Sequence, residues 1–365
     1  MSSDKTLCLS FIESSSCDKR CCCCCRGCCD CDETADAMVE TVGAQAAGKA
    51  TCSTARNSAV DDACAVDKIL SKQGEEKMPR TATNLLRSTL LNIYNEISAL
   101  PTLSPNPATE AAFSKLIHTC CQPANKWSLT ETEISQFIAT DKVIQAFHPT
   151  MLALRGKAET CLENYHARLI IASENPVKAL EEFPYYRNYV NMIHTEAHIL
   201  YAAIGAPLQL NPYKVMFIGS GPLPMSALLL ARDYFTFAQF TCIDMDENAN
   251  ALARQIVSFY CDSKRFQFIS QDINHVEQNV IEGCNVIFMA ALVGPNCSTK
   301  LQILSRIASK MQKGAFLMIR STCGLKTLLY PELKDVDWVQ FGLNLIFNVH
   351  PGNQAVHSVV VLQKD

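Results

Sequence analysis

The chain has 365 residues, 48% hydrophobic side chains and a formal net charge of −4 at pH 7. This length suits two globular parts, or one large part with an appendage. The acidic balance excludes the basic surface that nucleic-acid binding needs. No run of about 18 apolar residues is free of glycine, proline and charge, so we expect no membrane-spanning helix. The N-terminal sequence MSSDKTLCLS lacks the pattern of a secretory signal.

Cysteine is unusually frequent near the N-terminus. Ten of the 20 cysteines lie in the first 31 residues, and Cys21–Cys25 are consecutive. Neighbouring cysteines make a poor disulfide framework, because their side chains cannot all reach partners at disulfide geometry. The others lie mostly in apolar settings, where cysteine behaves as a small hydrophobic residue. We therefore expect reduced thiols and a cytoplasmic protein.

Three interpretations of the segment Cys21–Cys31 stay open. Dense thiolates bind soft metals such as Zn²⁺ or Cu⁺, but only Cys25 and Cys28 have the C-x-x-C spacing and no paired histidines follow. Strings of cysteines are also acylated, and two or more acyl chains attach a protein stably to a membrane. The third interpretation is a tail without a selected role.

Residues 1–78 as a whole are predicted to be disordered. They contain no aromatic side chain after Phe11 and are rich in Ala, Ser, Thr and Asp beyond the cysteines. Such a segment cannot bury enough apolar surface to offset the loss of chain entropy.

Residues 79–208 are predicted to form an all-helical domain. Leu86, Leu90, Ile93 and Ile97 are spaced by four, three and four residues, which places them on one face of a helix that ends before Pro101. Four further helices are predicted over residues 109–121, from a capping box at residues 128–131, over residues 151–173 and over residues 186–204.

Residues 209–365 alternate apolar strands with helix-like segments, which is typical of an α/β domain with a parallel sheet. The last two strands have no room for a helix between them, so we predict five parallel strands and a C-terminal antiparallel hairpin. The strands are predicted within residues 214–219, 238–246, 265–272, 284–292, 315–321, 338–349 and 355–363.

A glycine turn, Gly219-Ser220-Gly221-Pro222, follows the first of these strands. The two glycines permit positive φ and let the backbone approach a ligand closely. Pro222 and Pro224 have no N–H, and neither the P-loop lysine nor the third glycine of a dinucleotide motif is present. A ligand without a pyrophosphate therefore fits better. The junction of a strand with a helix N-terminus is where α/β folds bind nucleotide-like ligands.

Acidic residues end the next two predicted strands. Asp244, with Asp246 as second choice, is placed to accept hydrogen bonds from ribose hydroxyls, and Asp272 to meet an adenine amine. Each acid alone also fits a turn residue. Their order in one βαβαβ unit predicts a Rossmann-like, S-adenosylmethionine-binding α/β domain that follows the helical domain.

One face of the helix predicted over residues 151–173 is polar. Arg155, Glu159, Glu163 and His166 fall within a sector of about 80°, at about 100° per residue. From the spacing alone, a solvated face with an Arg–Glu ion pair explains this pattern better than a catalytic site does.

Several motifs of the chain resemble the nicotianamine synthase family over about residues 80–365. These motifs are FPYYRNY (183–189), FIGSGPLP (217–224), FMAALVG (288–294), LMIRS with LLYP (317–331) and VHPGNQAVHSVVV (349–361). The resemblance implies a helical domain on a Rossmann-like domain. It also implies an enzyme that condenses three S-adenosylmethionine molecules through their aminobutyrate arms, releases methylthioadenosine and closes an azetidine ring. S-adenosylmethionine is then a substrate, and the chemistry requires no metal.

The resemblance implies that the catalytic residues are Glu163 and Tyr189, on which the family's glutamate and tyrosine fall. The nucleophile would be an α-amine, which is largely protonated at pH 7, so a carboxylate or phenol must orient it and take its proton. Glu163 would take the proton and Tyr189 would hold the amine, with Glu159 as the competitor. Tyr185 and Tyr186 are expected to pack between the domains.

Three residues depart from the family's pattern and bear on how substrate carboxylates are held. Lys157 stands where plant members tend to have glutamate, His357 where asparagine is usual and Lys326 where arginine is usual. Arg320, at the end of a predicted strand, fits either a carboxylate anchor or a structural ion pair.

Two other functions stay open. A methyltransferase would share the sheet, Asp244 and S-adenosylmethionine, but it would release S-adenosylhomocysteine and would not need Glu163 or Tyr189. A non-enzymatic metal-binding protein would use the fold only to carry the cysteine-rich segment.

Overall fold

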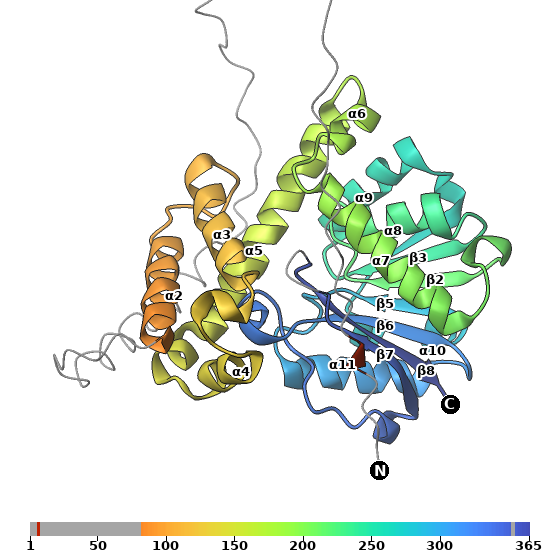
Figure 1. Ribbon diagram of the computed structural model, residues 1–365. Coiled ribbons are helices and arrows are strands. Elements are labelled where there is room, and N and C mark those ends of the chain that lie inside the picture. The colour runs from red at the N-terminus through yellow and green to blue at the C-terminus, as the bar shows by residue number, and fades with distance from the viewer. Residues whose placement is uncertain (1–5, 8–81, 352–354) are drawn as a thin grey trace, which may run out of the picture.

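The computed structural model describes residues 6–7, 82–351 and 355–365 (Figure 1). The segment Cys21–Cys31 lies outside the described residues, as does nearly all of residues 1–78. The predictions of disorder, acylation and soft-metal binding for this segment therefore stay predictions.

The first four α-helices of the described residues share a hydrophobic core. They are α2 (Ala82–Ser98), α3 (Pro107–Cys120), α4 (Glu131–Thr140) and the N-terminal half of α5 (Lys142–Ala172). The residues predicted to share one face of α2 are buried in this core. Leu325, Leu328 and Tyr330 pack into the same core from the C-terminal half of the chain, where η6 (Gly324–Leu328) forms a short 3-10 helix.

The capping box of α4 lies two residues later than predicted. Thr130 is the N-cap: its hydroxyl accepts a hydrogen bond from the Glu133 N–H (3.2 Å), and the Glu133 carboxylate accepts one from the Thr130 N–H (2.7 Å). Ser128 has a φ of 55° and closes η1 (Ala124–Trp127), so its backbone cannot begin this helix.

Helix α5 is longer than predicted and joins the two halves of the molecule. It begins at Lys142 rather than at residue 151, because Asp141 caps it and Pro149 is accommodated inside it. Its first half lies in the core of the helical layer, whereas Ala167 and Ile170 lie in a core shared with the sheet. Figure 1 shows α5 running between the two layers.

Helix α7 (Tyr186–Ile204) has the predicted bounds and follows the short α6 (Pro176–Glu181). Gly205 ends it in the left-handed conformation, with a φ of 70°. Ile193, Ala197 and Leu200 pack in the core that contains the first strands of the sheet. Helices on the N-terminal side of residue 208 thus contribute to both cores, and the domain boundary at that residue stays a prediction.

Among the residues that the structure describes, the sheet has eight strands in the order β1-β7-β8-β6-β5-β2-β3-β4. The five predicted parallel strands and the antiparallel C-terminal hairpin are confirmed. β1 (Thr6–Leu7) was not predicted and pairs in parallel with β7. The other strands are β2 (Lys214–Ile218), β3 (Gln239–Asp244), β4 (Phe266–Ser270), β5 (Val286–Met289), β6 (Phe316–Ser321), β7 (Leu343–Val349) and β8 (Ser358–Lys364).

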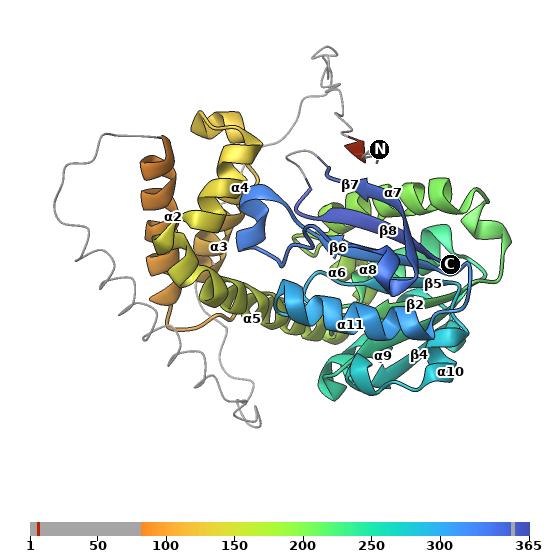
Figure 2. The same ribbon diagram turned by 90° about the horizontal axis from the view of Figure 1, so that it is seen from below.

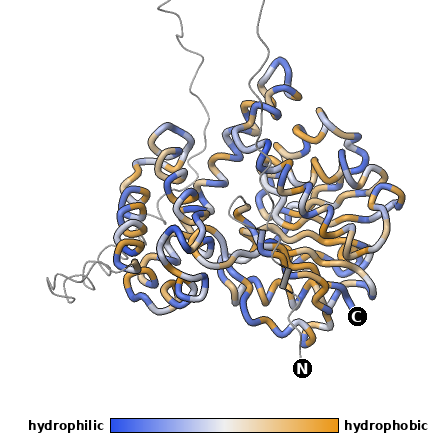
Figure 3. Tube along the Cα trace, in the orientation of Figure 1, coloured by the Kyte–Doolittle hydropathy of each residue, from blue (hydrophilic) through white to orange (hydrophobic). Residues whose placement is uncertain are grey.

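Helices cover both faces of the sheet, and Figure 2 shows α7 and α11 on opposite faces. These helices are α8 (Met225–Leu229), which continues into the π-helix η3 (Leu230–Tyr234), α9 (Glu247–Tyr260), α10 (Gln278–Glu282) and α11 (Cys297–Lys310). Because both faces are covered, the parallel strands are apolar along most of their length, as Figure 3 shows. In the part of the chain that the structure describes, none of the helices has the length and apolarity to cross a lipid bilayer.

Candidate active site

A cavity of about 1770 Å³ lies at the carboxyl ends of β2, β3 and β4. The strand order reverses beside β2, and this is the position at which doubly wound sheets bind ligands. The cavity exceeds the roughly 300–1,000 Å³ of a pocket for one small ligand. All nine residues predicted for the site line it: Glu163, Tyr189, Gly219, Ser220, Gly221, Pro222, Asp244, Asp246 and Asp272.

The glycine turn brings the sheet into contact with helix α5. Gly219 and Gly221 have φ values of 76° and 67°, a conformation that favours glycine. A side chain at Gly219 would meet Val293 at 2.5 Å, and one at Gly221 would meet the Glu163 carboxylate at 2.5 Å. The Glu163 carboxylate therefore lies directly against the backbone of the turn, where only a glycine leaves room for it.

Two backbone N–H groups, one of them in the glycine turn, hold the side chain of Asp244 in place. Its carboxylate accepts hydrogen bonds from the N–H of Gly221 (2.9 Å) and the N–H of Asp246 (3.0 Å). Asp246 itself caps α9, and Asp272 accepts the N–H of Asn274 at 2.8 Å. The latter two acids have the turn and capping contacts that were the alternative to a ligand role, so their part in ligand binding stays a prediction.

Glu163 and Tyr189 meet inside the cavity. The Tyr189 hydroxyl on α7 donates a hydrogen bond to the Glu163 carboxylate on α5 at 3.2 Å. Burial, together with the nearby Glu159 and Asp244 carboxylates, raises the pKa of Glu163 well above its ordinary value. Burial and the Glu163 carboxylate also raise the pKa of Tyr189, so the phenol keeps its proton. The pair thus combines an unusually basic carboxylate with a neutral hydrogen-bond donor.

A second carboxylate–phenol pair lies one helical turn away. The Tyr330 hydroxyl donates to the Glu159 carboxylate (2.8 Å) and accepts from the Arg155 guanidinium (2.8 Å), which also forms an ion pair with Glu159 (3.1 Å). The predicted Arg–Glu pair exists, but it is not on a solvated face, because its side chains are only 12% and 18% exposed. His166 does not join this cluster and packs on Phe183 with a ring-centroid distance of 4.9 Å.

Comparison with known proteins shows the family to which the chain belongs. Residues 78–365 match the family model described as nicotianamine synthase protein. The chain belongs to the nicotianamine synthase family. Nicotianamine synthase 2 of Arabidopsis thaliana is 32% identical over 283 residues, which cover 77% of this chain and 84% of the relative. The tomato (Solanum lycopersicum) nicotianamine synthase is 32% identical over 274 residues, or 74% and 81% of the two chains. The family resemblance drawn from the motifs is confirmed.

Solved structures of MtNAS share the fold. A glutamate-to-glutamine mutant of MtNAS in complex with S-adenosylmethionine has a TM-score of 0.62 at 18% identity, covering 76% of this chain and 97% of that chain. MtNAS in complex with MTA and tNA has a TM-score of 0.58 at 17% identity, covering 86% and 100%. The predicted class, a Rossmann-like domain preceded by helices, is confirmed.

The buried side chains of Arg320 and Lys300 are both bound by other groups of the protein. Arg320 forms a bidentate ion pair with Glu196 (2.7 and 2.9 Å) and donates to the Ser226 hydroxyl (2.9 Å), so it is the ion-pair member rather than a free carboxylate anchor. Lys300 is fully buried and donates to the carbonyls of Ala291 (2.7 Å) and Val293 (3.0 Å), which fixes the loop after β5. Burial lowers the pKa of Lys300 to about 7.

Sequence reasoning did not assign roles to Tyr330 or Lys300. Tyr330 belongs to the LLYP motif, which was quoted only as part of the resemblance, and the Lys300 carbonyl contacts give no sequence signal at all.

Of the departures from the family's pattern, Lys157 is exposed, and Lys326 donates to the Ala355 carbonyl at 2.6 Å. His357 lines the cavity beside Tyr330, with ring centroids 4.4 Å apart.

Tyr185 and Tyr186 pack against a core, and each also makes a further contact. Both pack against the core shared by α7 and the sheet, and the Tyr186 hydroxyl also accepts from Arg232 at 3.2 Å. Tyr185 additionally lines the cavity. Among the described residues, no group of three or more His, Cys, Asp or Glu side chains is placed to hold a metal ion.

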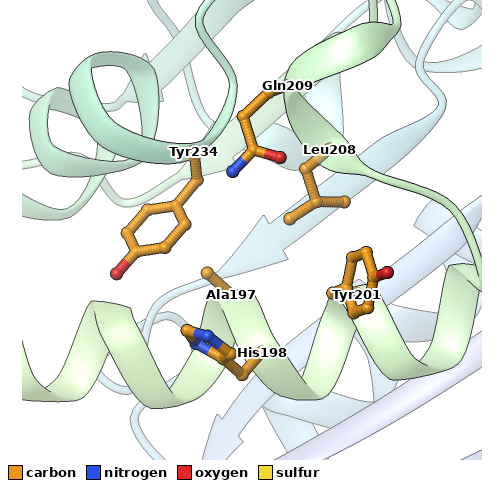
Figure 4. Close-up of a pocket in the computed structure, with 6 residues that line it drawn as sticks. All are labelled: Ala197, His198, Tyr201, Leu208, Gln209 and Tyr234. Atoms are coloured by element: carbon orange, nitrogen blue, oxygen red, sulfur yellow. The ribbon is translucent and has the colours of Figure 1, made fainter.

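A second pocket, of about 200 Å³, lies between α7, residues 208–209 and Tyr234 (Figure 4). It is lined by Ala197, His198, Tyr201, Leu208, Gln209 and Tyr234. None of these residues lines the large cavity, so substitutions here serve as controls for substitutions there.

Proposed function

We propose that this chain is a nicotianamine synthase that condenses the 3-amino-3-carboxypropyl arms of S-adenosylmethionine and releases 5'-methylthioadenosine. The observation that carries the proposal is the Glu163–Tyr189 pair, held directly against the glycine turn of an S-adenosylmethionine-type fold. Family membership supports the same activity.

The nucleoside half of the substrate is assigned to the sheet. The carboxylate of Asp244 accepts the ribose hydroxyls, Asp272 meets the adenine amine, and the turn of Gly219, Ser220, Gly221 and Pro222 lies against the arm. Asp244→Ala removes a charged acceptor, so S-adenosylmethionine binding should weaken by about 1.5–3 kcal/mol in calorimetry. Unchanged affinity would move the ribose role to Asp246.

The chemical step takes place where α5 and α7 face the turn. The sulfonium activates the aminobutyrate carbon, and the α-amine of another substrate attacks it. The new C–N bond forms as the C–S bond breaks, and the electron pair of the C–S bond stays on sulfur as neutral methylthioadenosine. Glu163 takes the amine proton, and Tyr189 holds the nitrogen. Because its pKa is raised, the Glu163 carboxylate is a stronger base than an ordinary glutamate.

A methyltransferase is the alternative, and the leaving nucleoside separates the two. The full chain is incubated with S-adenosylmethionine alone and the nucleoside is identified by chromatography and mass spectrometry. Methylthioadenosine is the expected product. S-adenosylhomocysteine formed with an added acceptor would instead identify a methyltransferase, and the absence of both nucleosides would favour a non-enzymatic binding protein.

The segment Cys21–Cys31 is proposed to act outside the chemistry, either as an acylated membrane attachment or as a soft-metal site, in a cytoplasmic enzyme. Both functions use reduced thiols, which suits the reducing cytosol. Hydroxylamine-sensitive lipid on the purified chain supports attachment. Acid-labile Zn²⁺ or Cu⁺ supports the metal site, and finding neither leaves a tail without a role.

A further inference from the structure

Two histidines on α7 have no part in the proposed chemistry. His194 and His198 belong to the sequence HTEAH and are four residues apart, so their side chains lie on one face of the helix, one turn apart. Both residues are exposed, and their ring centroids are 4.2 Å apart. His198 borders the smaller pocket together with Tyr234, as Figure 4 shows.

Hydrogen bonds determine which ring nitrogens of the pair are free. The Nδ1 of His198 lies 2.6 Å from the backbone carbonyl oxygen of His194. A carbonyl oxygen only accepts, so the neutral His198 ring carries its proton on Nδ1 and its lone pair on Nε2. The Nδ1 of His194 lies 2.9 Å from the Tyr234 hydroxyl, which can accept in the same way. Among the described residues, neither Nε2 atom has a hydrogen-bond partner.

This arrangement is typical of histidines that bind a metal ion. Such a histidine usually donates its other ring N–H to an oxygen, which fixes both the tautomer and the orientation of the ring. His194 and His198 each have that contact already. Two histidines four residues apart on a helix are also a known pair of metal ligands. Solvation of a helix face explains why the rings are exposed, but it does not require both Nδ1 atoms to be held.

The spacing of the rings indicates the kind of metal. An ion bound at about 2.1 Å to an imidazole nitrogen lies about 3.2 Å from the centre of that ring. Two rings with centroids 4.2 Å apart can then share one ion with an angle of about 80° at the metal. The tetrahedral angle typical of Zn²⁺ needs centroids about 5 Å apart, whereas an angle of about 90° is typical of tetragonal Cu²⁺ or Ni²⁺.

We propose that the Nε2 atoms of His194 and His198 form a binding site for one Cu²⁺ or Ni²⁺ ion, with Tyr234 as the residue that orients the His194 ring. Water molecules complete the coordination, because the described residues place no group of three His, Cys, Asp or Glu side chains around a metal position. The bound ion joins two turns of α7. The site is independent of the chemistry at Glu163 and needs no S-adenosylmethionine.

The test measures Ni²⁺ binding to the full chain by equilibrium dialysis in mildly alkaline buffer, where imidazole is neutral. The cysteines contribute equally in every variant, so the difference between the wild type and a variant isolates the site. His194→Asn and His198→Asn each remove one ligand and should each lower the uptake by one Ni²⁺ per chain. Tyr234→Phe keeps both ligands but removes the acceptor for the His194 Nδ1, so the affinity should fall about tenfold.

His118→Asn is the matched control, because His118 is an exposed histidine on another helix, α3, and its uptake should equal that of the wild type. The proposal is wrong if His194→Asn and His198→Asn take up as much Ni²⁺ as the wild type, or if His118→Asn loses as much as they do. Selective ¹⁵N labelling of histidine gives a second measurement. The ring resonances of His194 and His198 should be the first to shift or broaden as Ni²⁺ is added, and an earlier change at other histidines would overturn the site.

Discussion

At the scale of single residues, the site consists of contacts between positions far apart in the chain. Tyr189 and Glu163 are 26 residues apart, and Tyr330 and Glu159 are 171 apart. Sequence spacing placed Arg155, Glu159 and Glu163 on one helix face but favoured solvent for it, because periodicity does not show what covers a polar face. The resemblance supplied Glu163 and Tyr189, and no local signal pointed to Tyr330 as the partner of Glu159.

Glu163→Gln should lower turnover by about 10²–10⁴-fold, because the amide keeps the size of the side chain but cannot take a proton. S-adenosylmethionine affinity should change little in calorimetry, because the nucleoside contacts are assigned to the sheet. Tyr189→Phe should slow turnover less if the phenol only orients the amine. Glu182→Gln is the matched control, since its side chain is 65% exposed at the C-cap of α6. Near wild-type turnover of Glu163→Gln would remove Glu163 from the mechanism.

The raised pKa of Glu163 predicts the pH dependence of the activity. Burial disfavours its carboxylate, so the basic form appears only well above the ordinary value of 4.5. The ratio kcat/KM should therefore fall as the pH decreases through this raised pKa, and the residual activity of Glu163→Gln should lack that limb. An acid limb at an ordinary glutamate pKa in the wild-type enzyme would contradict the assignment.

The same shift has a consequence for stability. Between 4.5 and the raised pKa, the folded chain binds a proton that the unfolded chain has lost, so this group's contribution to stability decreases as the pH rises through that window. Glu163→Gln has no carboxyl group that titrates, so this variant does not lose stability in that pH window. Thermal unfolding should show Glu163→Gln to be more stable than the wild type above the window and no more stable below it.

At the scale of elements, the sequence predicted the helices and strands whose bounds depend on residues nearby in the chain. The bounds of α7 follow from apolar periodicity and from Gly205 at the helix end. The alternation of strands and helices along the chain follows from the same kind of apolar pattern. The start of α5 was wrong because Pro149 reads as a helix boundary, whereas Asp141 caps an earlier start. β1 was missed because a two-residue strand has no periodicity, and its pairing depends on the distant β7.

The glycine turn is the element whose shape the site requires most directly. Gly221→Ala places a methyl group 2.5 Å from the Glu163 carboxylate and at a φ of 67°. Gly314→Ala is the matched control, because it has a φ of 79° but no atom within 4 Å of the added carbon. Both should lose stability from the backbone strain, by about 1 kcal/mol or more in denaturant unfolding. Only Gly221→Ala should also lower turnover strongly, and equal turnover of the two variants would show that the close contact is not needed.

At the scale of the whole molecule, two hydrophobic cores meet along α5. One core holds the first four helices with Tyr330, and the other holds the C-terminal part of α5, helix α7 and one face of the sheet. The cavity lies between them, lined by residues of both halves. A substrate bound there would lie between the glycine turn and the helical layer, and a reaction between two substrate molecules needs such a shared cavity.

Removal of residues 1–78 tests whether the remaining residues suffice for the enzyme. The family match begins at residue 78, and the three hydrophobic cores of the described residues consist of residues from 86 onward. The deletion removes β1, but β7 keeps its pairing with β8 along its length. The shortened chain should therefore release methylthioadenosine at a rate close to that of the full chain, because every residue of the three cores and of the cavity lining remains. Its thermal midpoint should shift by only a few degrees, since about 1 kcal/mol corresponds to roughly 2–4 °C in a domain of this size. Loss of soluble expression or of turnover would show that the N-terminal segment belongs to the folded enzyme.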